Sequence, residues 1–208
     1  NIGGAFLLFP NGVKALKALG LQHIVEKLQV EINSASSFAT NGEKLISGEL
    51  NQPGGFYAQT GERLYTLGRT ELQQLLLEAL EAKGVKIVFG HTCNKIEEKN
   101  DGVCVSFTNG TRVKAKYICG ADGVNSIVRE YISPQITPQN IDLCVFGGIL
   151  EKSYVVNLQE FNIPQDGMVS HFGDNLSLWL CPLSQGRQSF YIHAKISKDE
   201  FNRWDDKL

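Results

Sequence analysis

The sequence has no apolar stretch approaching the roughly 20 residues that a bilayer-spanning helix requires. It also has no run of basic residues longer than two. Lys and Arg number 20 against 22 Asp and Glu, which gives a net charge of −2. Binding to nucleic acid or to anionic lipid depends on clustered positive charge, so we expect neither. With 42% hydrophobic and 20% charged residues, the chain can form a core and is not expected to be disordered.

The five cysteines lack the close spacing of zinc or redox pairs, since neighbouring ones are 11, 15, 25 and 37 positions apart. An odd number of cysteines in a chain of 208 residues indicates reduced thiols, and we expect a cytoplasmic protein with no metal site. Three lie in apolar, strand-like runs, where cysteine usually serves as a small core residue: Cys104, Cys119 and Cys144. The chain begins on Asn1 and directly on such a run, so we expect it to be a piece of a longer protein.

Hydrophobic periodicity predicts one clear helix at residues 70–83, where leucines at three- and four-residue spacing form an apolar stripe. Thr70 and Gln73 fit a capping box at its start, and Gly84 fits its end. A shorter helix is expected after Pro10. The periodicity therefore predicts that the first part of the chain contains helices packed on strands.

Strands are expected in three groups. The first comprises weak signals near residues 36–38 and 44–46, a partly exposed strand at 59–67 and another strand at 85–89. The second is a meander at 93–99, 103–108 and 112–118, because Asp-Gly and Asn-Gly between these runs favour tight hairpins. The third comprises runs at 141–150, 167–172, 176–181 and 188–196, which predict an antiparallel sheet. The order of elements indicates the α/β (α+β) class.

Residues 117–129 carry the most chemical content. A strand leads into Gly120-Ala121-Asp122-Gly123, and a helix is expected to begin near Ser126. Small residues let a ligand approach the backbone, and a helix start offers N–H groups to phosphate. Asp122 can accept hydrogen bonds from ligand hydroxyls, and Arg129 can turn back toward this loop. The alternative is a plain tight turn with Asp122 as a helix cap and Arg129 as a surface charge, and both interpretations stay open.

Arg69 directly precedes the helix expected from Thr70. A cation at a helix start is unfavourable with the helix dipole unless an anion binds there. Arg69 is therefore a candidate contact for a diphosphate. The alternative is a solvated arginine without a partner.

Three separated stretches resemble the FAD-dependent monooxygenases of the aromatic-hydroxylase (p-hydroxybenzoate hydroxylase-like) family. They are Gly4-Ala5 through Gly20-Leu21, Arg69-Thr70-Glu71-Leu72 through Gly84-Val85, and Cys119 to Arg129, which is similar to the Asp-Gly fingerprint of the family. The resemblance is good over residues 3–132 and loose thereafter. It implies an internal fragment of such an enzyme.

The resemblance implies a partial FAD-binding, Rossmann-like domain with a β-meander at residues 1–135, with substrate-domain strands inserted near 31–67. A truncated antiparallel substrate-domain sheet would follow at 136–208. The parent enzyme would bind FAD, take electrons from NADH or NADPH, and use O2 to hydroxylate a small organic, typically aromatic, substrate. The resemblance supplies no catalytic base and no oligomeric state.

The resemblance also implies which residues contact the cofactor. Gly4 and Ala5 would lie near the flavin ring, and Arg69 near the FAD diphosphate. Asp122 and Gly123, with Gly120, would belong to the fingerprint that touches FAD and the nicotinamide donor, and Arg129 would brace it. The candidate cofactor-binding set is Gly4, Ala5, Arg69, Gly120, Asp122, Gly123 and Arg129.

The sequence departs from the family pattern in two places. It contains no Gly-x-Gly-x-x-Gly turn, and Gly173-Asp174 fits a hairpin turn better than the flavin-end Gly-Asp motif. We therefore expect the fragment itself to bind FAD poorly and to be inactive. Alternatives are a non-catalytic binding module that kept the fold, or a flavin-dependent oxidase, reductase or halogenase, or a nicotinamide-only dehydrogenase.

Aromatic residues in the late strands are candidates for a substrate pocket, because alternating aromatics on a sheet can line an apolar cavity. They are Phe146, His171, Phe172 and Trp179. Each fits an ordinary core position equally well, and for His171 the core position is favoured.

Overall fold

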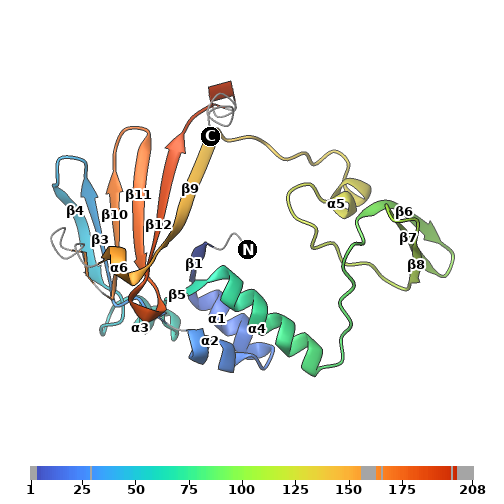
Figure 1. The fold of residues 1–208 in the computed structure, drawn as a ribbon, viewed down its shortest axis with the longest axis horizontal. Coiled ribbons are helices and arrows are strands. Elements are labelled where there is room, and N and C mark those ends of the chain that lie inside the picture. The colour runs from blue at the N-terminus through green and yellow to red at the C-terminus, as the bar shows by residue number, and fades with distance from the viewer. Residues whose placement is uncertain (1–3, 29, 156–162, 165, 198, 201–208) are drawn as a thin grey trace. The chain divides into compact units, whose positions relative to one another are not determined.

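The computed structural model describes residues 4–28, 30–155, 163–164, 166–197 and 199–200 (Figure 1). The chain forms two compact units, one made of Val85–Ile141 and the other of the residues before and after it. Each unit is described by itself. Among the described residues, no helix combines the length and the apolar character needed to cross a bilayer.

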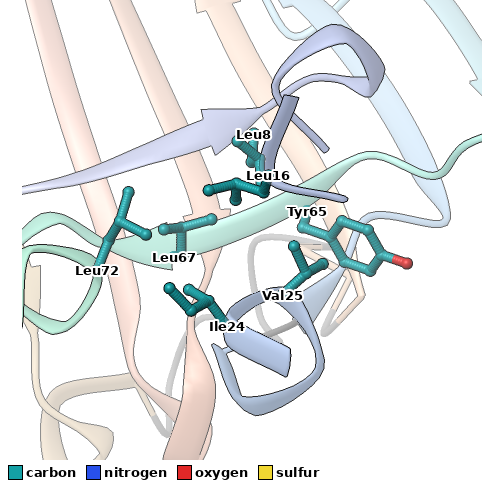
Figure 2. Close-up of a pocket in the computed structure, with 7 residues that line it drawn as sticks. All are labelled: Leu8, Leu16, Ile24, Val25, Tyr65, Leu67 and Leu72. Atoms are coloured by element: carbon teal, nitrogen blue, oxygen red, sulfur yellow. The ribbon is translucent and has the colours of Figure 1, made fainter. Parts of the chain in front are cut away.

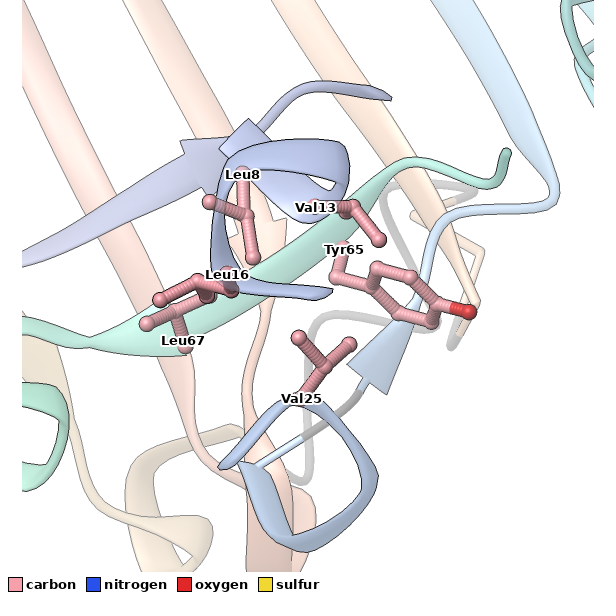
Figure 3. Packing of buried hydrophobic residues seen from close by; sticks show 6 residues of the cluster. All are labelled: Leu8, Val13, Leu16, Val25, Tyr65 and Leu67. Carbon is pink, nitrogen blue, oxygen red and sulfur yellow. The ribbon is translucent and has the colours of Figure 1, made fainter. Parts of the chain in front are cut away.

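The larger unit contains a small antiparallel sheet covered by helices. The sheet has the order β1-β5-β2, with strands β1 (Ala5–Leu8), β5 (Tyr65–Gly68) and β2 (Val30–Glu31). The helices are α1 (Pro10–Ala18), α2 (Gln22–Leu28) and α4 (Arg69–Ala82). Strands and helices enclose one apolar cluster, shown in Figure 3: Leu8, Val13, Leu16, Val25, Tyr65 and Leu67. Leu72 and Leu76 of the α4 stripe pack against this cluster, so the predicted periodicity is confirmed.

The start of α4 differs from the prediction. The helix begins at Arg69 after an extended Gly68, and no side chain caps it, so the expected Thr70–Gln73 capping box is wrong. The reason is that β5 runs straight into α4. The Arg69 N–H donates to the Gly4 carbonyl at 2.9 Å, which fixes the helix start one residue earlier.

The segment expected as a strand at residues 59–67 is divided. Its first residues belong to α3 (Phe56–Thr60), and Gly61 ends this helix in a left-handed conformation with φ 71°. Only the residues from Tyr65 onward form a strand, and they are buried where partial exposure was expected.

A six-stranded sheet forms the rest of the larger unit and has the order β4-β3-β10-β11-β12-β9 (Figure 1). Its strands are β3 (Ser34–Ala39), β4 (Lys44–Glu49), β9 (Leu143–Leu150), β10 (Gly167–Phe172), β11 (Leu176–Pro182) and β12 (Gln188–Lys195). The four late strands are confirmed. The sheet is antiparallel except where β10 pairs in parallel with β3, so it is wider and more mixed than the sequence predicted.

The two faces of this sheet differ. One carries an apolar cluster of Val169, Leu180 and Ile163, with Phe38, Leu178 and Phe190 packed against it. Short turns of helix join the strands at α6 (Lys152–Val155) and at Ser184–Gly186. The opposite face is available to line a cavity.

The smaller unit contains the predicted meander, with β6 (Cys93–Lys99), β7 (Gly102–Phe107) and β8 (Arg112–Ala115), followed by α5 (Ile127–Ile132). Gly102 and Gly110 have φ of 145° and 83°, as the hairpin signals require. Ile96, Val105 and Val128 are its buried apolar residues.

Three predictions for this unit are wrong. Residues 85–89 form no strand, and Phe89 is 78% exposed. The last meander strand ends at Ala115, which leaves Tyr117 82% exposed and Cys119 exposed where a core position was expected. A strand requires a neighbour for its backbone hydrogen bonds, and none of the described residues pairs with either segment.

Candidate functional site

The main cavity of the larger unit has a volume of about 490 Å³ and lies between β1 and the six-stranded sheet. Its volume falls within the range of about 300–1,000 Å³ typical of small-molecule sites. Its lining residues are Ala5, Phe6, Leu7, Phe9, Thr66, Val145, Trp179, Cys181, Ser189, Tyr191 and His193. Most of this lining is apolar, so the cavity suits a ring system.

Strand register explains why these side chains share one face of the sheet. Trp179 lies opposite Tyr191, Cys181 opposite Ser189, and Val145 opposite His193. Directly opposed residues in a sheet point to the same side, and alternate residues along a strand do as well. Residues 189, 191 and 193 of β12 therefore form the centre of the cavity wall.

Tyr191 fixes β1 against this wall. The Ala5 N–H donates to the Tyr191 hydroxyl at 2.6 Å, and this hydroxyl donates to the Ala5 carbonyl. Two glycines make room for the ring, since a Cβ on Gly147 would lie 2.5 Å from the Tyr191 Cδ1 atom and one on Gly4 would lie 3.0 Å from its oxygen. Burial raises the pKa of Tyr191, so the hydroxyl keeps its proton.

A chain of polar contacts runs along the same wall. The Trp179 indole N–H donates to the Ser177 hydroxyl at 3.1 Å, and this hydroxyl lies 3.3 Å from Nδ1 of His193. The Trp179 and His193 rings meet edge to face at 6.0 Å. Burial raises the pKa of the nearby Cys181 thiol to about 12, so it is neutral.

Of the four aromatic candidates for the substrate pocket, one lines this cavity. Trp179, for which a cavity position and a core position were equally open, lines the cavity. Phe172 packs edge to face on Trp179 at 5.6 Å but is not part of the lining. Phe146 and His171 lie on the opposite face, where His171 stacks on Phe38 at 5.3 Å. They lie outside the cavity lining because each is one position out of step with the lining residues.

Tyr191, His193, Val145 and Cys181 line the cavity and were missed. The sequence Ser189-Phe190-Tyr191-Ile192-His193 could have identified part of this wall. Residues with a polar group alternate in it with purely apolar ones, and those with a polar group line the cavity.

A second hollow lies beneath the small sheet and has no room for even a water molecule (Figure 2). Its lining is aliphatic apart from Tyr65: Leu8, Leu16, Ile24, Val25, Tyr65, Leu67 and Leu72. This hollow belongs to the packing between α1, α2 and β5.

Gly4, Ala5 and Arg69 are brought together beside the main cavity. Ala5 pairs with Gly68, and the backbone N–H of Arg69 meets the Gly4 carbonyl. The first turn of α4 is also tied to the β11–β12 connection. There Arg187 donates to Glu71 at 2.7 Å and to the Ser184 hydroxyl at 3.0 Å.

The other four candidate residues are brought together in the smaller unit. The Asp122 carboxylate accepts from the Ser126 hydroxyl at 2.5 Å and from the backbone N–H of Ile127 at 2.8 Å. The Ser126 hydroxyl bond, followed by these backbone bonds, lowers the pKa of Asp122. These are the contacts of a helix cap, one of the two roles considered for this residue.

Glycine conformation and packing shape the rest of this turn. Gly123 adopts φ 82°, and a Cβ on Gly120 would lie 2.5 Å from the Cβ of Val128. Nε of Arg129 is buried, and the described residues offer it no hydrogen-bond partner. Val128 therefore fills the space on one side of the loop. Nε of Arg129 remains a donor for an acceptor that the described residues do not supply.

The comparisons with known proteins agree on one family. The model of the FAD binding domain matches residues 5–207. The FAD-dependent urate hydroxylase of Klebsiella pneumoniae is 29% identical over 196 residues, which are 94% of this chain and 48% of that protein. The 3-amino-4-hydroxybenzoate 2-monooxygenase of Streptomyces cremeus is 26% identical over 201 residues, covering 96% of this chain and 48% of that protein.

Solved structures give the same result. Klebsiella pneumoniae HpxO, complexed with FAD and uric acid, superposes with a TM-score of 0.81 and 26% identity, over 95% of this chain and 49% of that one. The chain spans about half the length of the curated relatives it matches. It belongs to the FAD-binding domain family of p-hydroxybenzoate hydroxylase-like aromatic hydroxylases.

Proposed function

We propose that this chain is part of a flavin-dependent monooxygenase that uses NADH or NADPH and O2 to hydroxylate a small aromatic substrate. The observation that carries the proposal is the cavity of about 490 Å³ between β1 and the sheet, in a chain of the FAD-binding domain family. Relatives named as a urate hydroxylase and a hydroxybenzoate monooxygenase support the reaction class.

Each unit contains residues that fit part of FAD, and each is considered by itself. The β1 wall of the cavity offers Ala5 and the preceding Gly4, whose lack of bulk lets a flat ring approach the backbone. In the larger unit, Arg69 at the start of α4 is a donor suited to phosphate. In the smaller unit, the buried Nε of Arg129, which has no hydrogen-bond partner among the described residues, is a donor suited to an acceptor oxygen. Gly120, Asp122 and Gly123 would hold the turn in which Arg129 lies. When bound, FAD would supply the electron transfer to O2 that the protein side chains cannot provide.

The chain itself would contribute positioning and exclusion of water. Tyr191 holds β1 at a fixed distance from the sheet, so the two walls keep a constant separation. Phe6, Leu7 and Trp179 supply an apolar lining that disfavours water around the reacting atoms. His193 and its partner Ser177 offer a hydrogen bond that would orient the substrate.

The test uses the complete natural protein that contains these residues. We expect a bound yellow flavin, NADH or NADPH oxidation that depends on substrate, and one ¹⁸O atom from ¹⁸O2 in the product. A Trp179→Ala variant should lower kcat/KM at least tenfold, whereas His171→Phe on the opposite face should change it little.

Other outcomes identify the alternatives. Stoichiometric H2O2 without ¹⁸O in any product would indicate an oxidase, and a halogenated product would indicate a halogenase. A protein without flavin or redox activity would indicate a binding module, and a protein without flavin that still transfers hydride to or from a nicotinamide would indicate a nicotinamide-only dehydrogenase.

A further inference from the structure

Most hydrogen-bonding groups on the cavity wall are already paired within the protein. The Thr66 hydroxyl donates to the Pro182 carbonyl, and the Tyr191 hydroxyl is engaged by both backbone groups of Ala5. The Ser189 hydroxyl donates to the Cys181 carbonyl at 3.2 Å. A ligand that entered the cavity would therefore find few free polar groups on this side.

His193 is the exception. Its Nδ1 faces the Ser177 hydroxyl at 3.3 Å, and no described residue forms a hydrogen bond with its Nε2. Because His193 lines the cavity, Nε2 is a polar atom of this wall that remains for a ligand, whereas the neutral Cys181 thiol is only a weak donor.

The neighbouring contacts favour one of the two tautomers of His193. An indole N–H can only donate, so Trp179 makes the Ser177 oxygen an acceptor. The Ser177 proton is then available for Nδ1 of His193. With Nδ1 accepting, the neutral imidazole carries its proton on Nε2 and presents a donor to the cavity.

The charge of the lining narrows the ligand class further. None of the described residues that line the cavity is Lys, Arg, Asp or Glu. An anion that moves from water into such a lining loses hydration without gaining a cationic partner, and this costs far more than placing a neutral ring there.

We propose that this cavity wall selects a neutral aromatic molecule with one hydrogen-bond acceptor, which Nε2–H of His193 engages, and that it disfavours aromatic carboxylates. His193 is then a specificity-determining residue. The inference rests on the proposed function, because it concerns the substrate cavity of that enzyme. It also separates this chain from its Streptomyces cremeus relative, whose name specifies a benzoate.

The test measures dissociation constants by titration calorimetry on the complete natural protein at pH 8, with three probes of similar size. Acetophenone is neutral and has a carbonyl acceptor, ethylbenzene has no acceptor, and benzoate is an anion. We expect acetophenone to bind about tenfold more tightly than ethylbenzene, since one hydrogen bond to an otherwise unpaired donor is worth about that factor. Benzoate should bind more weakly than acetophenone.

Two variants test the role of His193. His193→Phe keeps an aromatic ring and should weaken acetophenone binding about tenfold while leaving ethylbenzene binding unchanged. His193→Gln should retain much of the affinity because its amide can donate from a similar place. His171→Phe, on the opposite face, is the matched control and should leave all three constants unchanged.

Three results would overturn the inference. Benzoate could bind as tightly as acetophenone in the unmodified protein, which needs no variant to observe. If His193→Phe weakened the binding of acetophenone and of ethylbenzene equally, His193 would act only through packing. If none of the probes bound, the inference would fail, and the separate ¹⁸O experiment would show whether the proposed function fails too.

Discussion

A single hydroxyl, that of Tyr191, holds an edge strand in place. β1 is at the edge of its sheet, so one row of its backbone groups has no strand neighbour. Tyr191 satisfies both the N–H and the carbonyl of Ala5, although the two residues are 186 positions apart. Buried backbone groups left without partners are costly, so this contact stabilises the placement of β1 beside the cavity.

Tyr191→Phe should lower the free energy of unfolding by about 1–3 kcal/mol, because it removes two hydrogen bonds and leaves both Ala5 groups unsatisfied. Urea denaturation followed by circular dichroism measures this change. Tyr154→Phe is the control, because Tyr154 is 76% exposed. Loss of its hydroxyl should change the free energy of unfolding by less than about 0.5 kcal/mol. Equal effects of the two substitutions would contradict the role of the hydroxyl.

A shift of one position along a strand decides whether a residue faces the cavity or the opposite side of the sheet. Trp179 and Phe146 were equally open to a cavity or a core position; Trp179 lines the cavity, whereas Phe146 lies on the opposite face. Side chains alternate along a strand, so the facing of each depends on the register with neighbouring strands. The pairing of Phe146 with Ile192 comes from tertiary structure and is not encoded in the residues near Phe146.

At the scale of elements, both packing and hydrogen bonds determine α5 and the turn before it. Val128 of α5 occupies the space that a side chain at Gly120 would fill, and Ser126 and Asp122 satisfy the N–H groups at the helix start. This turn is similar to the family fingerprint, and its glycine is required by packing within the chain as well. The structural role is therefore met within the chain, and the ligand role proposed for this segment would add to it.

Gly120→Ala should destabilise the smaller unit by about 1–3 kcal/mol, because the new methyl group would overlap Val128. Combining it with Val128→Gly removes the Cβ and both Cγ atoms that the new methyl group would meet, so the two changes together should cost less than their sum by about 1 kcal/mol. Hydrogen exchange of amides in β6 and β7 reports the stability of this unit. Gly48→Ala is the control, because nothing lies within 4 Å of the position that its Cβ would take. Additive effects of the two substitutions at positions 120 and 128 would contradict a direct contact between them.

Residues 85–89 show why element prediction is limited. Val85, Ile87, Val88 and Phe89 have strong strand preference, yet they form no strand and are 39–78% exposed. Strand preference describes how well a side chain fits a sheet that already exists. The weak signal at residues 36–38 proved correct because β10 supplies a partner, whereas the described residues supply none for 85–89.

At the scale of the whole molecule, family membership and cofactor affinity must be separated. The chain matches the FAD-binding domain over nearly its whole length but spans about half of its curated relatives. Its 208 residues include no Gly-x-Gly-x-x-Gly turn, which in dinucleotide-binding folds brings the backbone to the pyrophosphate. The fold class could be predicted from the order of elements, whereas the parallel pairing of β3 with β10 could not, because it joins residues far apart in sequence.

The isolated 208-residue chain should bind FAD weakly, with no saturation below roughly millimolar concentration, because it lacks that phosphate-binding turn. Flavin fluorescence during FAD titration measures this affinity. The complete natural protein serves as the control and should bind at least a hundredfold more tightly. Micromolar binding by the isolated chain would show that the residues described here suffice for the cofactor.

The parallel pairing of β3 with β10 has a consequence for biosynthesis. Ser37 and Ser170, which meet across this pair, are separated by 133 positions. At bacterial or eukaryotic translation speeds, the nascent chain emerges with β3 lacking its partner for on the order of ten seconds. Throughout that interval an unprotected strand edge is open to other polypeptides, which makes the ribosome-bound intermediate a natural client for chaperones.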